Sequence, residues 1–206
     1  MIRSLRFLCF ILLLCLLSAC LPTAAAPSTP SSTSNWAYSD LRLLDEVDAP
    51  LADQDIIAAY TRTSGDSFEI RLDLLDLKAE AGLDLYVPIA SGPSAISKEL
   101  PLHASADFAW NTLLVIPANA EPRAMTAQNE TFSVAPITVN RDPAMDTIVI
   151  RLDRSWMPTD PGALRLQVFA TAPGALNVVD QTPSFLANGI QPVPRAPLLL
   201  AFWDTL

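Results

Sequence analysis

Hydrophobic and polar residues alternate along much of the chain after residue 35. In residues 67–74 every second position is large and apolar, namely Phe68, Ile70, Leu72 and Leu74. A period of two residues is typical of a strand in an antiparallel sheet that buries one face. The same pattern predicts strands at 38–44, 55–62, 67–75, 84–89, 109–116, 132–139, 147–152 and 164–171.

Turn-forming residues separate these segments. Gly65 and Asp66 lie between two of the strands and predict a hairpin that joins 55–62 to 67–75. Residues 75–81 are expected to add a helical turn. Eight short strands with such turns predict an all-β fold, an antiparallel β-sandwich. A body of about 150 residues buries enough surface to fold without disulfides.

The first twenty residues have the features of an export signal. Arg3 and Arg6 precede an apolar run at 7–17, which is shorter than the roughly 20 residues of a transmembrane helix. The run closes with Leu17-Ser18-Ala19-Cys20. This motif resembles the lipobox of bacterial lipoproteins, and the resemblance implies cleavage before Cys20 and a lipid on its thiol. An ordinary secretory signal that is cut elsewhere is the alternative.

Composition agrees with export and anchoring. Residues 20–35 form an uncharged segment rich in Pro, Ser, Thr and Ala, which predicts a flexible tether after a signal peptide at 1–19. Cys9 and Cys15 lie in the signal, so Cys20 alone remains and no internal disulfide can form. We therefore expect an extracytoplasmic protein, anchored by its lipid to the cell membrane or to an outer membrane.

The charge of the chain is strongly negative. It has 22 acidic and 13 basic residues, for a net charge of -9, which becomes -11 once Arg3 and Arg6 are removed. Nucleic-acid binding requires clustered Lys and Arg, so we expect no nucleic-acid partner.

A second resemblance concerns the body of the chain, residues 36–190. The acidic stretch 40–48, the strand 55–60, the two strands in 147–171 and the segment 179–183 resemble the carbohydrate-binding-like and DOMON-like β-sandwich domains of secreted bacterial enzymes. The resemblance implies a non-catalytic binding or display domain with polysaccharide as a ligand. The alternatives are an accessory domain or N-terminal fragment of a carbohydrate-active enzyme, and a structural protein of the cell envelope.

Five carboxylates fall within eleven residues at 45–55. Calcium prefers several oxygen ligands, which makes this loop a candidate metal site. No other cofactor is expected. Pro50 and Leu51 interrupt the loop and an EF-hand glycine is absent, which favours the alternative of a solvated acidic turn. The candidate ligands are Asp45, Asp48, Asp53 and Asp55.

Other candidate chemistry is weaker. Gly65-Asp66-Ser67 matches the core of the nucleophile block in GDSL-type esterases, but the single histidine, His103, lacks the Asp three residues before it that the motif requires. We therefore expect no enzyme. Five aromatic residues could line a sugar platform or fill the core, namely Trp36, Tyr38, Trp110, Trp156 and Trp203. The core is favoured for Trp110 and Trp156.

Residues 191–206 differ from the rest. Three prolines at 192–197 indicate a linker, and 198–203 is a continuous apolar run without alternation. The run is either the first strand of a missing second domain or a last strand that pairs with the sandwich, and periodicity does not separate the two.

Overall fold

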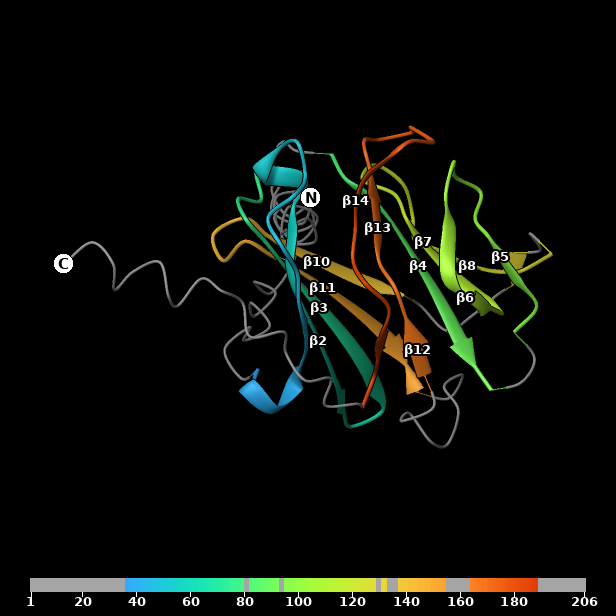
Figure 1. Ribbon diagram of the computed structural model, residues 1–206. Coiled ribbons are helices and arrows are strands. Elements are labelled where there is room, and N and C mark those ends of the chain that lie inside the picture. The colour runs from blue at the N-terminus through green and yellow to red at the C-terminus, as the bar shows by residue number, and fades with distance from the viewer. Residues whose placement is uncertain are drawn as a thin grey trace, which may run out of the picture. The chain divides into compact units, whose positions relative to one another are not determined.

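A computed structural model describes residues 36–79, 82–92, 95–128, 131–132, 137–154 and 164–188. Contacts between Cα atoms assign residues 37–206 to one unit and residues 1–36 to another. Within the described residues the helical elements are two short 3-10 turns, η2 (Tyr38–Asp40) and η3 (Ala52–Gln54), and the rest of the regular structure is strand. Every strand pair is antiparallel. The predicted all-β sandwich is confirmed (Figure 1).

Sheet A has five strands in the order β1-β2-β3-β11-β10. β2 and β3 form the predicted hairpin, in which Gly65 adopts a φ of 57°. A positive φ at the first of two turn residues is the pattern of a type II′ turn, which glycine adopts without a steric penalty. The strands of sheet A are β1 (Leu41–Leu44), β2 (Ile56–Ser64), β3 (Ser67–Leu74), β10 (Thr138–Asp142) and β11 (Thr147–Asp153).

Sheet B has eight strands, and its main path runs β14-β13-β4-β7-β8-β9. β12 and β15 extend it, because β12 pairs with both β4 and β15. The strands of sheet B are β4 (Asp84–Ser91), β7 (Thr112–Ile116), β8 (Arg123–Thr126), β9 (Thr131–Phe132), β12 (Leu164–Leu166), β13 (Phe169–Thr171), β14 (Val178–Gln181) and β15 (Phe185–Leu186). A separate hairpin consists of β5 (Ser97–Glu99) and β6 (Ser105–Trp110).

Two apolar clusters hold these layers together. The larger one lies between the sheets, where Phe68 and Leu72 of β3 pack in the same cluster as Val87 of β4. The smaller one lies on the other face of sheet B, where Trp110 of β6 packs with Phe169 of β13. Sheet B is therefore buried on both faces, whereas sheet A presents one face to solvent.

The strand predictions are partly wrong in both sheets. In sheet A, residues 38–40 of the predicted strand 38–44 form the 3-10 turn η2, and β1 begins only at Leu41. The segment 109–116 is two strands, because β6 ends at Trp110 and β7 begins at Thr112. Asn111 between them bonds through its side chain to Ser91. Residues 164–171 are likewise two strands, and 132–139 contains parts of β9 and β10. The predicted helical turn at 75–81 is wrong for residues 75–79, while 80 and 81 lie outside the described residues.

A buried arginine joins the first and last described strands. The side chain of Arg42 on β1 is 9% exposed and donates from Nε to Thr61 Oγ1 at 2.8 Å and to the carbonyl oxygen of Ala187, which directly follows β15. Its Nη1 donates to the carbonyl oxygen of Ser39 at 2.6 Å. Burial lowers the pKa of Arg42, and its charge is balanced here by carbonyl dipoles.

Candidate functional site

The acidic loop connects β1 to β2 at one end of sheet A. The N–H of Asp45 donates to the carbonyl oxygen of Ile57 at 2.9 Å, which continues the pairing of the two strands. η3 folds the loop back, so that Asp55 directly precedes β2. Asp55 is 0% exposed. The loop thus differs from a solvated turn at this residue.

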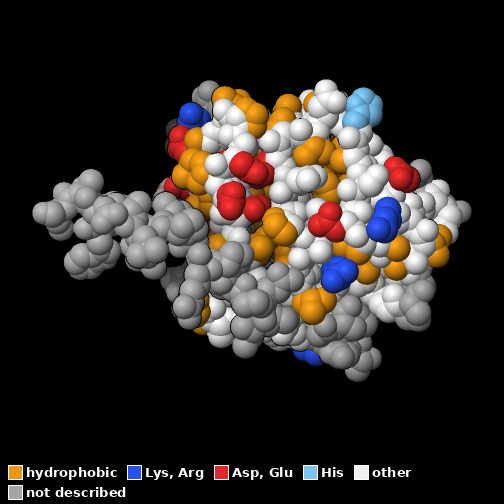
Figure 2. All heavy atoms as spheres, viewed as in Figure 1, with side chains coloured by type: hydrophobic (Ala, Val, Ile, Leu, Met, Phe, Trp, Pro, Cys, Tyr) orange, Lys and Arg blue, Asp and Glu red, His pale blue; other side chains and the backbone are white. Residues whose placement is uncertain are grey.

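A carboxylate from the other sheet faces the end of this loop. Asp180 on β14 is 5% exposed, and its Oδ2 accepts a hydrogen bond from the N–H of Ile56 at 2.7 Å. Oxygen atoms of Asp48, Asp55 and Asp180 all lie within 4.8 Å of one another. We call these three residues the carboxylate triad. Figure 2 shows acidic side chains gathered left of centre on the face that it presents.

Within the carboxylate triad, Asp55 is the residue without a partner. Neither of its oxygens accepts a hydrogen bond of normal geometry. Burial raises its pKa, and the negative charge of Asp48 adds to the rise, while the nearby N–H groups of Asp48 and Ala49 partly oppose it. A carboxylate that is buried and unpaired carries a high desolvation cost.

Asp45 and Asp180 are also perturbed. Burial raises the pKa of Asp45 to about 7 and that of Asp180 to about 6, and the other carboxylates of the group contribute to both rises. Asp45 accepts a hydrogen bond from the N–H of Glu46 at 3.0 Å, but its Oδ2 is buried without a partner. Four carboxyl groups, of which Asp55 and Asp180 are buried and Asp48 is exposed, therefore lie close enough to repel one another.

No positive side chain compensates this group in the described part of the chain. The ion pairs there join Arg62 and Arg151 to Glu69, Arg71 to Asp73, and Lys78 to Asp76. The first three of these pairs lie on strands of sheet A, and the fourth follows β3. Among the described residues, the triad is thus a group of carboxylates that no Lys or Arg side chain pairs with.

The structure brings together three of the four candidate ligands and adds one. Asp48 and Asp55 belong to the triad and Asp45 interacts with it, whereas Asp53 lies on η3 and is not part of it. Asp180 was missed because it lies more than 120 residues from the loop. The available signal was an acidic residue at a buried position of a strand, at 178–181.

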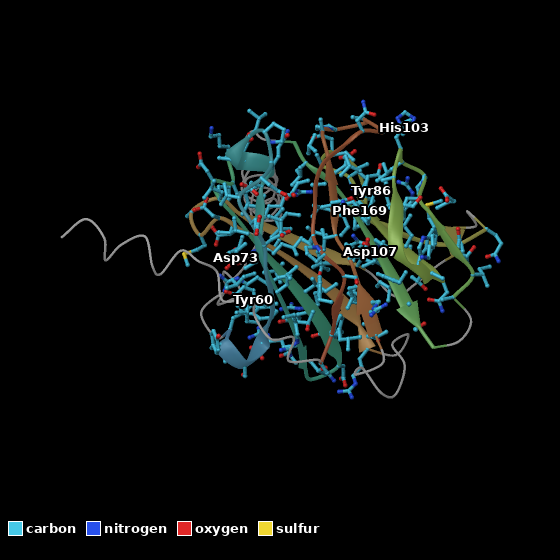
Figure 3. The ribbon with its side chains drawn as sticks, in the orientation of Figure 1. Tyr60, Asp73, Tyr86, His103, Asp107 and Phe169 are labelled. Carbon is cyan, nitrogen blue, oxygen red and sulfur yellow. The ribbon has the colours of Figure 1, made fainter. Side chains whose placement is uncertain are left out.

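The other candidates are placed apart from the triad. Ser67 begins β3 in sheet A, and its Oγ donates to the carbonyl oxygen of Ser64 at 2.8 Å within the hairpin. His103 lies on the exposed β5–β6 connection, with Nδ1 2.9 Å from Oδ1 of Asn177 (Figure 3). Trp110 is 1% exposed and belongs to the core, as expected, while Tyr38 is 80% exposed.

Several candidates lie outside the described residues. They are the lipidation site Cys20, the signal and tether at 1–35, Trp156, and the segment 191–206 with Trp203. In the described ranges no helix has the length and apolar character needed to cross a membrane.

A cleft of about 480 Å³ lies elsewhere, between residues 116–122 and strand β10. Arg141 contributes to its lining and donates from Nη2 to the carbonyl oxygen of Leu83 at 2.9 Å, while its Nη1 is buried without a partner. The lining contains no aromatic side chain that could stack on a ligand.

The chain matches no family model and no curated protein.

Proposed function

We propose that this chain is an extracytoplasmic lipoprotein, anchored through a lipid on Cys20, whose β-sandwich binds or displays and does not catalyse. The anchor is supported by the apolar run at 7–17 that ends in Leu17-Ser18-Ala19-Cys20. The uncharged segment that follows suits a tether between the lipid and the sandwich. Two or three acyl chains make such anchoring stable.

The binding role is carried by one observation, the carboxylate triad. Its three side chains are all carboxylates, and they come from the loop before β2 of sheet A and from β14 of sheet B. Such a group offers several negative oxygens to a ligand. Nucleophilic catalysis instead pairs a nucleophile with a base and its orienting group. The arrangement therefore favours binding.

Lipid labelling tests the anchor. Cells that express the full chain are grown with radioactive palmitate, and the label on the protein is compared between the parent, Cys20→Ala and Cys15→Ala. Cys15 lies inside the signal and serves as the matched control. We expect label on the parent and on Cys15→Ala and none on Cys20→Ala, which should also leave the membrane or stay unprocessed. Equal labelling of Cys20→Ala would contradict the proposal.

Polysaccharide is the second ligand class, and the outer face of sheet A favours it. Tyr60 on β2 lies there with Arg71, whose guanidinium is 5.0 Å from the ring centroid, and with Asp73, to which Arg71 donates at 2.6 Å (Figure 3). An aromatic ring beside a guanidinium and a carboxylate can both stack on a sugar and bond to its hydroxyls.

Retention on insoluble polysaccharides tests this ligand class. We expect Tyr60→Ala to reduce retention of the membrane-extracted chain, and Tyr38→Ala, at an exposed tyrosine of the same domain, to leave it unchanged. If the parent is not retained on any polysaccharide, or if Tyr60→Ala is retained equally, this face is not a sugar site.

A further inference from the structure

We propose that Asp48, Asp55 and Asp180 bind one calcium ion that links the two sheets of the sandwich. Asp48 and Asp55 belong to the loop before β2 of sheet A, and Asp180 belongs to β14 of sheet B. The inference deepens the proposed binding function by naming a ligand. It rests on the proposed function only for the extracytoplasmic location, where the site would be exposed to calcium.

The first argument is the state of Asp55. Its side chain is fully buried, neither of its oxygens accepts a hydrogen bond of normal geometry although the N–H groups of Asp48 and Ala49 lie near, and it faces two further carboxylates. Buried charges in proteins are almost always paired or bound to metal. Since none of the described Lys and Arg side chains pairs with Asp55, a cation is the partner that satisfies it.

The second argument is the geometry of the triad. Calcium binds oxygen ligands at 2.3–2.6 Å, so two ligands on opposite sides of one ion are about 4.6–5.2 Å apart. The three carboxylates lie within 4.8 Å of one another, which places them around one ion without a change of backbone. Asp48 is exposed, which gives the ion a path from solvent and leaves room for water ligands.

The third argument is the nature of the ligands. All three are carboxylates, and no histidine or cysteine belongs to the group. Oxygen ligands select hard cations, whereas zinc sites use nitrogen and sulfur. Magnesium demands a near-ideal octahedron with ligands at about 2.1 Å and keeps several of its waters, whereas calcium accepts an irregular set of carboxylates such as this one. Asp45, whose Oδ2 is buried, places a further carboxyl group beside the triad.

Ion binding has a structural consequence. Asp180 already joins the two sheets through its bond to the N–H of Ile56. An ion shared by Asp55 and Asp180 adds a second link at the same place. Extracellular calcium modules bind on the order of 10⁻⁴–10⁻³ M, and we expect an affinity in that range.

Direct binding tests the proposal. The full chain is extracted from membranes in a non-ionic detergent, stripped with EGTA, and dialysed against radioactive calcium. Asp48→Asn removes an exposed ligand and should leave the fold intact, while Asp53→Asn changes a carboxylate of the same loop that lies outside the triad. We expect about one ion per chain for the parent and for Asp53→Asn, and at least about tenfold weaker binding for Asp48→Asn.

Thermal unfolding of the same samples gives a second measurement. Calcium should raise the melting temperature of the parent by mass action, with a smaller effect from magnesium. Absence of bound calcium at concentrations of about 5 mM, well above the expected range, would overturn the proposal. So would calcium binding that Asp48→Asn leaves unchanged. Palmitate labelling of the same preparation reports on the anchor independently, so failure of either idea is recognised separately.

Discussion

Asp55→Asn should stabilise the protein when no metal is present, although it changes a fully buried residue. Asparagine has the same size as aspartate, so no cavity forms. It removes one charge from the triad, and its amide can donate to the unprotonated oxygens of Asp180. Most substitutions at buried positions destabilise, which makes the sign of this prediction distinctive.

The magnitude follows from the spacing of the carboxylates. The oxygens of the triad lie no more than 4.8 Å apart, and at that upper limit, with an effective dielectric constant of about 20, two negative charges repel by about 3.5 kcal/mol. Water screens the repulsion from Asp48, which is exposed, and partial protonation relieves some of the rest. We therefore expect a net gain of about 2 kcal/mol near pH 8, and much less near pH 5, which lies below the pKa of about 6 of Asp180.

Urea unfolding in EGTA at the two pH values measures this gain, with Asp53→Asn as the control. A shift of about 2 kcal/mol corresponds to a rise in melting temperature of roughly 4–8 °C for a domain of this size. Calcium should reverse the ranking, because the parent gains from the ion and Asp55→Asn does not. If Asp55→Asn destabilises the metal-free chain near pH 8, Asp55 has a structural role of its own and the electrostatic reasoning is refuted.

Three further predictions concern the rest of the domain. The metal-free parent should lose stability as the pH rises from about 4 to about 7. The pKa values of Asp45 and Asp180 in the folded state are about 7 and about 6, compared with 3.8 for an unperturbed group, so the folded state binds more protons than the unfolded state in this window. Urea unfolding at several pH values between these limits measures this loss, and added calcium should reduce it. Glu69→Gln should lower the free energy of unfolding by about 2 kcal/mol, because it weakens the charge-assisted bonds that a side chain only 2% exposed makes with Arg62 and Arg151, which water partly screens. Urea unfolding measures this change. A change below about 0.5 kcal/mol would mean that these ion pairs contribute no more than exposed ones. Gly65→Ala should cost about 1 kcal/mol because of the positive φ, without steric conflict, and a neutral result would place the strain elsewhere.

The sequence was most informative where a strand has one face in water. β3 alternates because Phe68 and Ile70 enter the core between the sheets, while Arg71 and Asp73 face outward and pair with each other. The period of two residues therefore reflects one buried face and one solvent-facing side of the strand. The same argument located β11 and the hairpin between β2 and β3.

The pattern was least informative in sheet B. In β7, Leu114 and Ile116 pack between the sheets, whereas Leu113 and Val115 pack beneath the β5–β6 hairpin. Both faces are apolar, so the alternation disappears and the break at Asn111 leaves no signal of its own. Burial of both faces depends on a hairpin elsewhere in the chain, and local pattern does not report it.

The carboxylate site was half predictable for a similar reason. Asp45, Asp48 and Asp55 are close in sequence, and their shared loop was visible from composition alone. Asp180 joins them only because one sheet packs on the other. Its hydrogen-bond partner Ile56 is 124 residues away in the sequence. Only the fold supplies that proximity.

The bonds of Arg42 also determine how the domain responds to mechanical force. One guanidinium links β1, at the start of the sandwich, to the carbonyl oxygen of Ala187 beyond its last described strand. A pull between the two ends of the domain therefore loads this side chain and its neighbour Thr61 before it reaches the core between the sheets. We therefore expect a domain fastened in this way to resist separation of its two described ends by force while the core between the sheets keeps its packing.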